Sequence, residues 1–102
     1  MSRTNFKYRQ PAVYILSNKN RKLLYIGVTS RLKDRIEEHK IGRGSDYTKK
    51  YKIQSLVYYE YHQRMQDALE REKQLKNWRR AWKWELIKSQ NPDLIDLYHT
   101  LV

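Results

Sequence analysis

Three short runs of apolar and β-branched residues stand out against the polar background of the chain. The runs Ala12 to Leu16 and Leu23 to Val28 are separated by the polar stretch Ser17 to Arg21, which is the pattern of a β-hairpin. Leu56 to Tyr61 is a third run of the same kind. The pattern therefore predicts three strands, of which the first two form a hairpin.

A helix is predicted directly after the hairpin. Leu32 and Ile36 repeat at helical spacing. Thr29 or Ser30 is expected to cap this helix, because a side-chain oxygen there can accept a hydrogen bond from a free N–H of the first turn.

Two glycines, Gly42 and Gly44, are expected to end this helix. The stretch Arg43 to Lys52 follows, and its bunched lysines predict a basic loop.

The last third of the chain is predicted to be helical. Neither Gly nor Pro occurs from Asp67 until Pro92. A straight helix of that length is unusual in a small domain, so a bend or break is expected near Arg79–Arg80. Asn91-Pro92-Asp93 is a helix-start signal, since Asn caps, Pro fits the first position and Asp favours the positive end of the helix dipole.

These elements predict an α+β fold with the order β-β-α-β-α-α-α, in which helices flank a small, three-stranded, mostly antiparallel sheet. The length of 102 residues fits one domain. We expect that domain to span 11–102, after a basic N-terminal arm at 1–10.

Charge indicates the kind of partner. The chain has 22 Lys and Arg against 11 Asp and Glu, a net charge of +11, and such a field attracts polyanions, above all nucleic acid. Nine tyrosines and three tryptophans suit base stacking as well as a small core. The chain has no cysteine, and no apolar run approaches the length of a membrane span. We therefore expect a soluble, cytoplasmic protein with no membrane partner.

The hairpin places candidate chemistry on one face of the sheet. If a four-residue turn joins the strands, Tyr14 lies opposite Tyr25 and Ala12 lies opposite Gly27. Both tyrosines and the glycine then share a face, with open space at the glycine for a backbone or a ligand. A simple cross-strand packing pair of tyrosines is the alternative.

The first predicted helix carries a second pair of candidates. Arg35 and His39 are four residues apart and so share one helix face. Arginine matches the geometry of phosphate oxygens, and histidine accepts a proton near neutral pH. Solvated surface charge is the alternative interpretation.

The long helical stretch contains a carboxylate among apolar residues. An inward stripe at helical spacing is formed by Met65, Ala68, Leu69, Glu72, Leu75 and Trp78. A carboxylate on such a stripe is costly unless it is paired or binds a metal. Glu72 is therefore a candidate metal ligand, with a salt bridge to Arg35 or to a lysine as the alternative.

Together these residues resemble the GIY-YIG nuclease family. Val13-Tyr14 followed by Tyr25-Ile26-Gly27 resembles its signature, although the first tripeptide is Ala12-Val13-Tyr14 rather than Gly-Ile-Tyr. The resemblance runs from Ala12 to Leu101 and is closest to small, free-standing bacterial members. Its further parts are Thr29, Arg35 and His39, then Ala68 to Gln74, Trp78 to Lys83, and Asn91-Pro92.

The resemblance implies roles for particular residues. Tyr14 and Tyr25 would line the active site and position or deprotonate the attacking water, and Gly27 is the signature glycine. Arg35 would bind the scissile phosphate. The resemblance leaves the general base open among Tyr14, Tyr25 and His39.

Glu72 matches the carboxylate that anchors a divalent metal in this family, which implies Mg²⁺ or Mn²⁺ as cofactor. The chain departs from the family pattern at Val28, where some members have lysine. It also departs near Trp84, where several members have an asparagine.

The resemblance thus implies a metal-dependent endonuclease that hydrolyses DNA phosphodiester bonds with low sequence specificity, acting on structured or single-stranded DNA in repair or recombination. RNA stays open as a substrate. A non-catalytic nucleic-acid-binding module is the alternative, and a protein-interaction domain using Trp78, Trp82 and Leu86 is a third. The residues expected to bind nucleic acid are Lys49, Lys50, Lys52, Arg79, Arg80 and Lys83.

Overall fold

The computed structural model describes residues 9–101 of the chain. Its elements are β1 (Ala12–Ser17), β2 (Leu24–Thr29), α2 (Leu32–Lys40), α3 (Asp46–Lys50), β3 (Ser55–Tyr61), α4 (Met65–Lys76), α5 (Arg80–Gln90) and the 3-10 helix η1 (Leu97–Thr100). The strands form one sheet in the order β2-β1-β3, and both neighbouring pairs are antiparallel. The predicted α+β class, with helices flanking a small antiparallel sheet, is confirmed.

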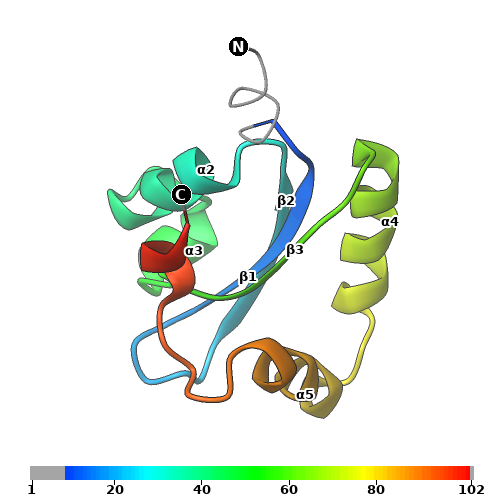
Figure 1. The fold of residues 1–102 in the computed structure, drawn as a ribbon. Helices are drawn as coiled ribbons and strands as arrows, with labels where there is room; N and C mark the ends of the chain where they lie inside the picture. The colour runs from blue at the N-terminus through cyan, green and yellow to red at the C-terminus, as the bar shows by residue number, and fades with distance from the viewer. Residues whose placement is uncertain (1–8, 102) are drawn as a thin grey trace.

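Two apolar layers cover the two faces of the sheet. Successive side chains of a strand point to opposite faces, so the even-numbered residues of β1 pack with Leu32 and Ile36 of α2. The odd-numbered residues pack with Ala68 and Leu75 of α4 and with Ile87 of α5. Figure 1 shows α2 and α3 on one side of the sheet and α4 on the other. Every residue of the central strand β1 is buried.

The helix after the hairpin begins later than predicted. Its N-cap residue is Arg31, whose side chain makes no capping hydrogen bond, so a cap at Thr29 or Ser30 is wrong. The Thr29 hydroxyl instead accepts a hydrogen bond from the Arg31 N–H at 3.0 Å and braces the turn before the helix. The helix ends at Lys40, and Gly42 follows with a φ of 85°, a conformation that glycine adopts without strain.

The segment predicted as a basic loop, Arg43 to Lys52, contains the short helix α3. Ser45 caps this helix, because its hydroxyl accepts a hydrogen bond from the N–H of Thr48 at 3.2 Å. The loop was predicted from the lysines, although positive charge alone does not distinguish an exposed loop from an exposed helix. The helix-start signal at Ser45 was overlooked.

The long helical stretch predicted from Asp67 is two helices. The first begins two residues earlier, at Met65, and ends at Lys76. The second begins at Arg80 after Arg79, whose backbone is extended. The predicted break near Arg79–Arg80 is confirmed.

No helix begins at Asn91, so that prediction is wrong. Asn91 is the C-cap residue of α5. Its carboxamide donates hydrogen bonds to the carbonyls of Val57 at 3.1 Å and Ile95 at 2.8 Å, and accepts one from the Ile95 N–H. A turn with Leu94 at a φ of 54° follows instead. Asparagine often caps the start of a helix, but here its side chain hydrogen-bonds the turn at Ile95 and the backbone of β3.

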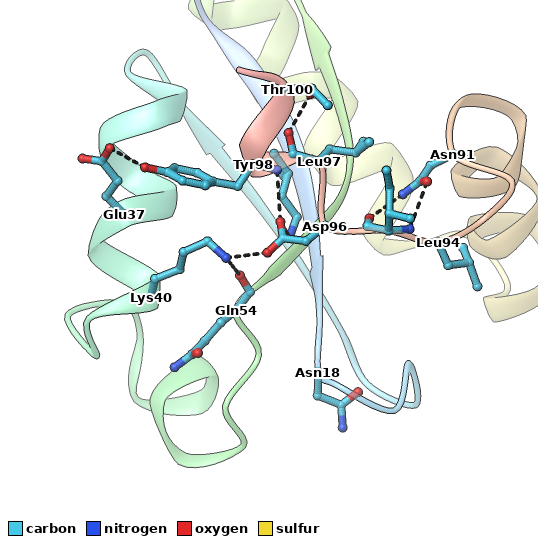
Figure 2. A network of polar contacts seen from close by, with 12 residues as sticks. Asn18, Glu37, Lys40, Gln54, Asn91, Leu94, Asp96, Leu97, Tyr98 and Thr100 are labelled. Atoms are coloured by element: carbon cyan, nitrogen blue, oxygen red, sulfur yellow. Dashed lines mark hydrogen bonds and ion pairs between the residues drawn. The ribbon is translucent and has the colours of Figure 1, made fainter. Parts of the chain in front are cut away.

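The end of the chain fastens α2 to β3, as Figure 2 shows. Asp96 accepts hydrogen bonds from the N–H groups of Leu56 and Tyr98 and pairs with Lys40 at 2.5 Å. Burial alone would raise the pKa of the Asp96 carboxyl, but Lys40 and the two N–H donors hold it below its usual value. The Tyr98 hydroxyl donates to Glu37 at 2.7 Å. These bonds fix the position of the helix that carries two predicted site residues.

No helix among the described residues is long and apolar enough to cross a bilayer. The arm predicted at 1–10 falls almost entirely outside the described residues, which begin at Arg9.

Candidate active site

Tyr14 and Gly27 face each other across the β1–β2 pair. The ring of Tyr14 is 1% exposed and lies directly over the glycine. A Cβ atom at Gly27 would stand 2.4 Å from both Cζ and Oη of that ring. Only glycine leaves room there, so the open space predicted at this position is filled by the tyrosine ring.

The predicted register of the hairpin is wrong by two residues, while the predicted face is right. Tyr25 pairs with Leu16 rather than with Tyr14. The loop is longer than four residues because the Asn18 side chain accepts hydrogen bonds from the N–H groups of Lys22 and Leu23. A slip of two residues keeps each side chain on its face.

Three rings gather on this face. The centroids of Tyr14 and Tyr25 are 6.3 Å apart. The ring of His39, from α2, lies 5.7 Å from the first and 5.6 Å from the second. The cross-strand pair of tyrosines is therefore part of a cluster that includes a titratable group.

His39 is fully enclosed. Its side chain is 2% exposed, and its Nε2 atom lies 3.0 Å from the Tyr14 hydroxyl. Its Nδ1 atom lies 3.1 Å from the hydroxyl of Thr48 on α3. His39 is therefore not solvated surface, and it can exchange a proton directly with Tyr14.

The same environment moves both pKa values away from neutrality. Burial, with the nearby Tyr25, raises the pKa of Tyr14 to about 12, although Arg35 opposes the shift. Burial and the Arg35 charge lower the pKa of His39 to about 4. In the resting site the proton therefore stays on Tyr14, and His39 is neutral.

Arg35 lies at the edge of the ring cluster. Its guanidinium pairs with Glu38, one turn along α2, at 2.9 Å, and its side chain is 31% exposed. Glu38 raises the pKa of Arg35 further, so the group is charged. Its charge acts on Tyr14, which places a guanidinium beside the phenol.

Glu72 comes from the opposite layer of the fold, on α4. Its carboxylate pairs with Lys76 at 3.3 Å and is 18% exposed. The alternative of a salt bridge to a lysine is therefore observed. The negative charge of Glu72 raises the pKa of Tyr14, so the carboxylate lies within electrostatic range of the ring cluster.

The predicted apolar stripe of α4 is only partly buried. Ala68 and Leu75 are fully buried, but Leu69 is 45% exposed, so its place on the stripe is wrong. The side of α4 that packs against the three-stranded sheet carries Ala68 and Leu75, and Leu69 lies outside this contact.

A divalent metal fits a single carboxylate of this kind. Within residues 9–101, no group of three or more metal-binding side chains occurs. Mg²⁺ is commonly held by one or two carboxylates, with water and substrate phosphates completing its shell. Glu72 is partly exposed, and its ion-pair partner Lys76 is exposed to solvent, so the carboxylate can serve as such an anchor.

The residues expected to bind nucleic acid form two groups on different layers. Lys49, Lys50 and Lys52 are exposed on and after α3. At the start of α5, the Arg79 guanidinium lies 5.4 Å from the ring centre of Trp82. The structure does not bring the two groups together.

Arg80 and Lys83 differ from the other cations of this set. The Arg80 guanidinium hydrogen-bonds the carbonyl of Lys22 and lies over Trp84, so it fastens α5 to the hairpin loop. Lys83 is half-buried.

The tryptophan-rich helices leave an open apolar groove. Trp78 and Leu86 are half-buried and Trp82 is 47% exposed. With Glu85 and Ser89 they line a hollow of about 520 Å³. Trp82 is therefore not a core residue.

Thr48 and Gly44 lie against His39, and neither was predicted to be a site residue. Thr48 is 2% exposed and touches His39. A Cβ atom at Gly44 would stand 2.1 Å from Nδ1 of His39. The overlooked signal was Ser45-Asp46 after a glycine, which predicts a helix start and so places Thr48 one turn into a helix.

Comparison with known proteins assigns the family. The family model described as the GIY-YIG catalytic domain matches residues 10–85, so the chain belongs to the GIY-YIG family. Membership implies nuclease-type activity on a nucleic-acid substrate.

Two relatives are small bacterial proteins of nearly the same extent. A "UPF0213 protein" of Syntrophus aciditrophicus (strain SB) is 42% identical over 82 residues, which are 79% of this chain and 92% of the relative. A "UPF0213 protein" of Staphylococcus aureus (strain Mu3 / ATCC 700698) is 37% identical over 67 residues, 66% of this chain and 82% of the relative. No solved structure matches the chain.

Proposed function

We propose that this protein is a divalent-metal-dependent endonuclease that hydrolyses DNA phosphodiester bonds with low sequence specificity. The main support is the Tyr14–His39 hydrogen bond, which lies beside the Arg35 guanidinium and within electrostatic range of Glu72. Phosphodiester hydrolysis needs a proton acceptor for water, a cation at the phosphate and charge relief at the leaving oxygen. Tyr14 and His39 supply the proton acceptor, and Arg35 supplies the cation at the phosphate. Glu72 supplies the anchor for a metal ion that would relieve charge.

The proton is handled by the two buried rings. Water that attacks phosphorus must lose a proton, and the Tyr14 oxygen is a suitable acceptor once its own proton has moved to Nε2 of His39. The high pKa of Tyr14 and the low pKa of His39 make this transfer unfavourable in the resting site. A cation near Tyr14 favours its ionised form and so lowers this cost.

Charge is handled by the two partly exposed residues. Arg35 leaves Glu38 and binds the phosphoryl oxygens, where its planar fork matches two acceptors. Glu72 is the residue that would hold Mg²⁺ or Mn²⁺ in place of its pair with Lys76, and the ion would supply charge neutralisation and a more acidic water.

The exposed lysines of α3 and Arg79 are the proposed contacts to the backbone of the nucleic acid. Phosphate contacts carry no sequence information, which agrees with low specificity. Cleavage of structured or single-stranded DNA would serve repair or recombination in the cytoplasm. RNA is the competing substrate and belongs in the same assay.

The test is cleavage of labelled single-stranded, duplex, flapped and branched DNA, and of the matching RNAs, with Mg²⁺, with Mn²⁺ and with a chelator. Glu72→Gln is compared with Glu70→Gln, which changes an exposed carboxylate on the same helix. We expect metal-dependent cutting of DNA that Glu72→Gln abolishes and Glu70→Gln retains. Cutting that survives the chelator or Glu72→Gln would overturn the metal assignment.

A non-catalytic binding module is the second candidate, because both charged site residues are already paired within their own helices. The same assay separates the two functions. Tight, salt-sensitive binding without cleavage in either metal would favour the second.

A further inference from the structure

Behind the ring cluster lies a buried hydroxyl that the proposed chemistry does not yet use. Thr48 is 2% exposed, and its Oγ1 lies 3.1 Å from Nδ1 of His39. The same hydroxyl lies 3.1 Å from the carbonyl oxygen of Ser45, to which it donates. The Ser45 hydroxyl in turn donates to it at 3.2 Å.

The hydrogen bond of the Tyr14 hydroxyl favours one of the two tautomers of neutral His39. Tyr14 is 1% exposed, and a buried phenol must donate its hydrogen bond within the protein. Arg35, whose charge acts on it, can only donate. In the described part of the chain, the acceptor within hydrogen-bonding distance is Nε2 of His39, at 3.0 Å. Nε2 therefore carries no proton, and a neutral imidazole must then be protonated at Nδ1.

Thr48 provides the acceptor that this tautomer needs. With its own proton on the Ser45 carbonyl, Oγ1 keeps a lone pair that receives the N–H of Nδ1. Without this acceptor, the buried N–H would be left without a hydrogen-bond partner, which would disfavour this tautomer.

The backbone at Gly44 lies close to the contact between His39 and Thr48. A Cβ atom at Gly44 would stand 2.1 Å from Nδ1 of His39 and 2.7 Å from Oγ1 of Thr48. The N-cap bond of Ser45 fixes the first turn of α3 and with it the Thr48 side chain.

We propose that Thr48 is a positioning residue, which holds His39 as the Nδ1–H tautomer and so keeps Nε2 free to take the proton of Tyr14. Its catalytic consequence rests on the proposed nuclease function, whereas the tautomer itself does not. In the reaction, the water oxygen bonds to phosphorus, and its proton moves to the Tyr14 oxygen as the Tyr14 proton moves to Nε2. The leaving oxygen takes a proton from water, and the extra proton of His39 returns by way of the Tyr14 hydroxyl to the hydroxide that this water leaves.

The experiment is long-range proton–nitrogen NMR of the full chain with ¹⁵N-labelled histidine, near neutral pH. The chain has 3 histidines, and the His39→Gln variant assigns the signal. We expect a protonated Nδ1 and an unprotonated Nε2 for His39 in the wild type. Thr48→Val keeps the shape but removes the acceptor, so it should shift the signal toward the other tautomer, and Thr48→Ser should restore it.

Cleavage provides the functional readout. Thr48→Val should lower kcat on the order of a hundred-fold with little change in KM, because loss of an orienting acceptor yields the wrong tautomer. Thr48→Ser should recover most of the rate, which a purely structural defect would not predict.

A wild-type His39 protonated at Nε2, or a Thr48→Val spectrum identical to that of the wild type, would overturn the proposal. If Thr48→Val does not fold, the wild-type and Thr48→Ser spectra still decide it. If the wild type cuts no substrate, the nuclease function fails, while the tautomer still shows whether Thr48 sets the state of His39.

Discussion

The ring cluster and the two charged residues of the site are built in different ways. Tyr14 and His39 are almost fully buried and bonded to each other across 25 positions of sequence. Arg35 and Glu72 are partly exposed, and each is paired with a residue three or four positions away on its own helix.

Folding sets the contact between Tyr14 and His39, whereas a bound phosphate or metal ion would have to replace the ion-pair partners of Arg35 and Glu72. The two rings are enclosed by the sheet, α2 and α3, so their geometry is set once these elements have packed. Exposed ion pairs within a helix contribute little, typically under about 1 kcal/mol. A phosphate or a metal ion can therefore replace Glu38 or Lys76 at small cost. The proposed proton-transfer half of the site, Tyr14 and His39, is therefore rigid, and the proposed charge-binding half, Arg35 and Glu72, is exchangeable.

The largest effect is expected from Arg35→Gln, which removes the exchangeable cation. Loss of a group that stabilises the transition state should lower kcat by roughly 10²–10³-fold. Arg31→Gln is the control, since Arg31 makes the same kind of pair with Asp34 at 2.6 Å but lies outside the cluster. Equal rates for the two variants in single-turnover cleavage would remove Arg35 from the site.

Gly27→Ala tests the rigid half. The new Cβ would stand 2.4 Å from Tyr14, and such overpacking should lower the free energy of unfolding by about 3 kcal/mol. Urea denaturation measures it. In a Tyr14→Leu background the same change should cost far less, and an equal cost in both backgrounds would show that the ring is not the obstacle.

The pH dependence of stability tests the burial of His39. Its pKa is lowered from 6.5 to about 4 in the fold, so below 6.5 the unfolded chain binds a proton that the folded chain does not. The free energy of unfolding should therefore fall as the pH drops through this range, by about 1–3 kcal/mol.

Urea denaturation at several pH values, with wild type and His39→Gln side by side, isolates this contribution. The variant should lose that part of the slope. Parallel curves for the two proteins would mean that His39 is not held neutral by burial.

The smallest effect is expected from Glu38→Gln, which frees Arg35 from its resting partner. Because the exposed pair contributes under about 1 kcal/mol, KM should fall only a few-fold with kcat nearly constant. Steady-state cleavage kinetics measure both constants. A rise in KM would show that Glu38 helps Arg35 to bind the phosphate rather than competing for it.

The sequence predicts those parts of the site that depend on periodicity. Tyr14, Tyr25 and Gly27 were expected on one face, and they are, because an alternation of two survives a shift of two residues. Their register was wrong, because the Asn18 side chain stabilises a longer loop. Loop length is set by a local hydrogen bond rather than by the apolar pattern.

Residues whose roles depend on tertiary contacts escaped prediction. Thr48 reads as a polar residue of a basic segment, and only the folded structure brings it to His39. Asn91 reads as a helix cap, yet its carboxamide bonds the backbone of Val57 on β3. The hydroxyl of Thr48 and the carboxamide of Asn91 can bond either to neighbouring backbone groups or to residues far along the chain. The sequence alone does not distinguish these two kinds of hydrogen bond.

The most direct test of the nuclease account is metal-dependent cleavage by Tyr14→Phe beside Tyr58→Phe. Each change removes one hydroxyl from a buried, hydrogen-bonded tyrosine, and Tyr58 lies on the opposite face, bonded to Glu60. The account predicts cutting by the wild type and by Tyr58→Phe, and a rate at least about 100-fold lower for Tyr14→Phe. Equal cutting by both variants, or no cutting by the wild type with either metal, would contradict it.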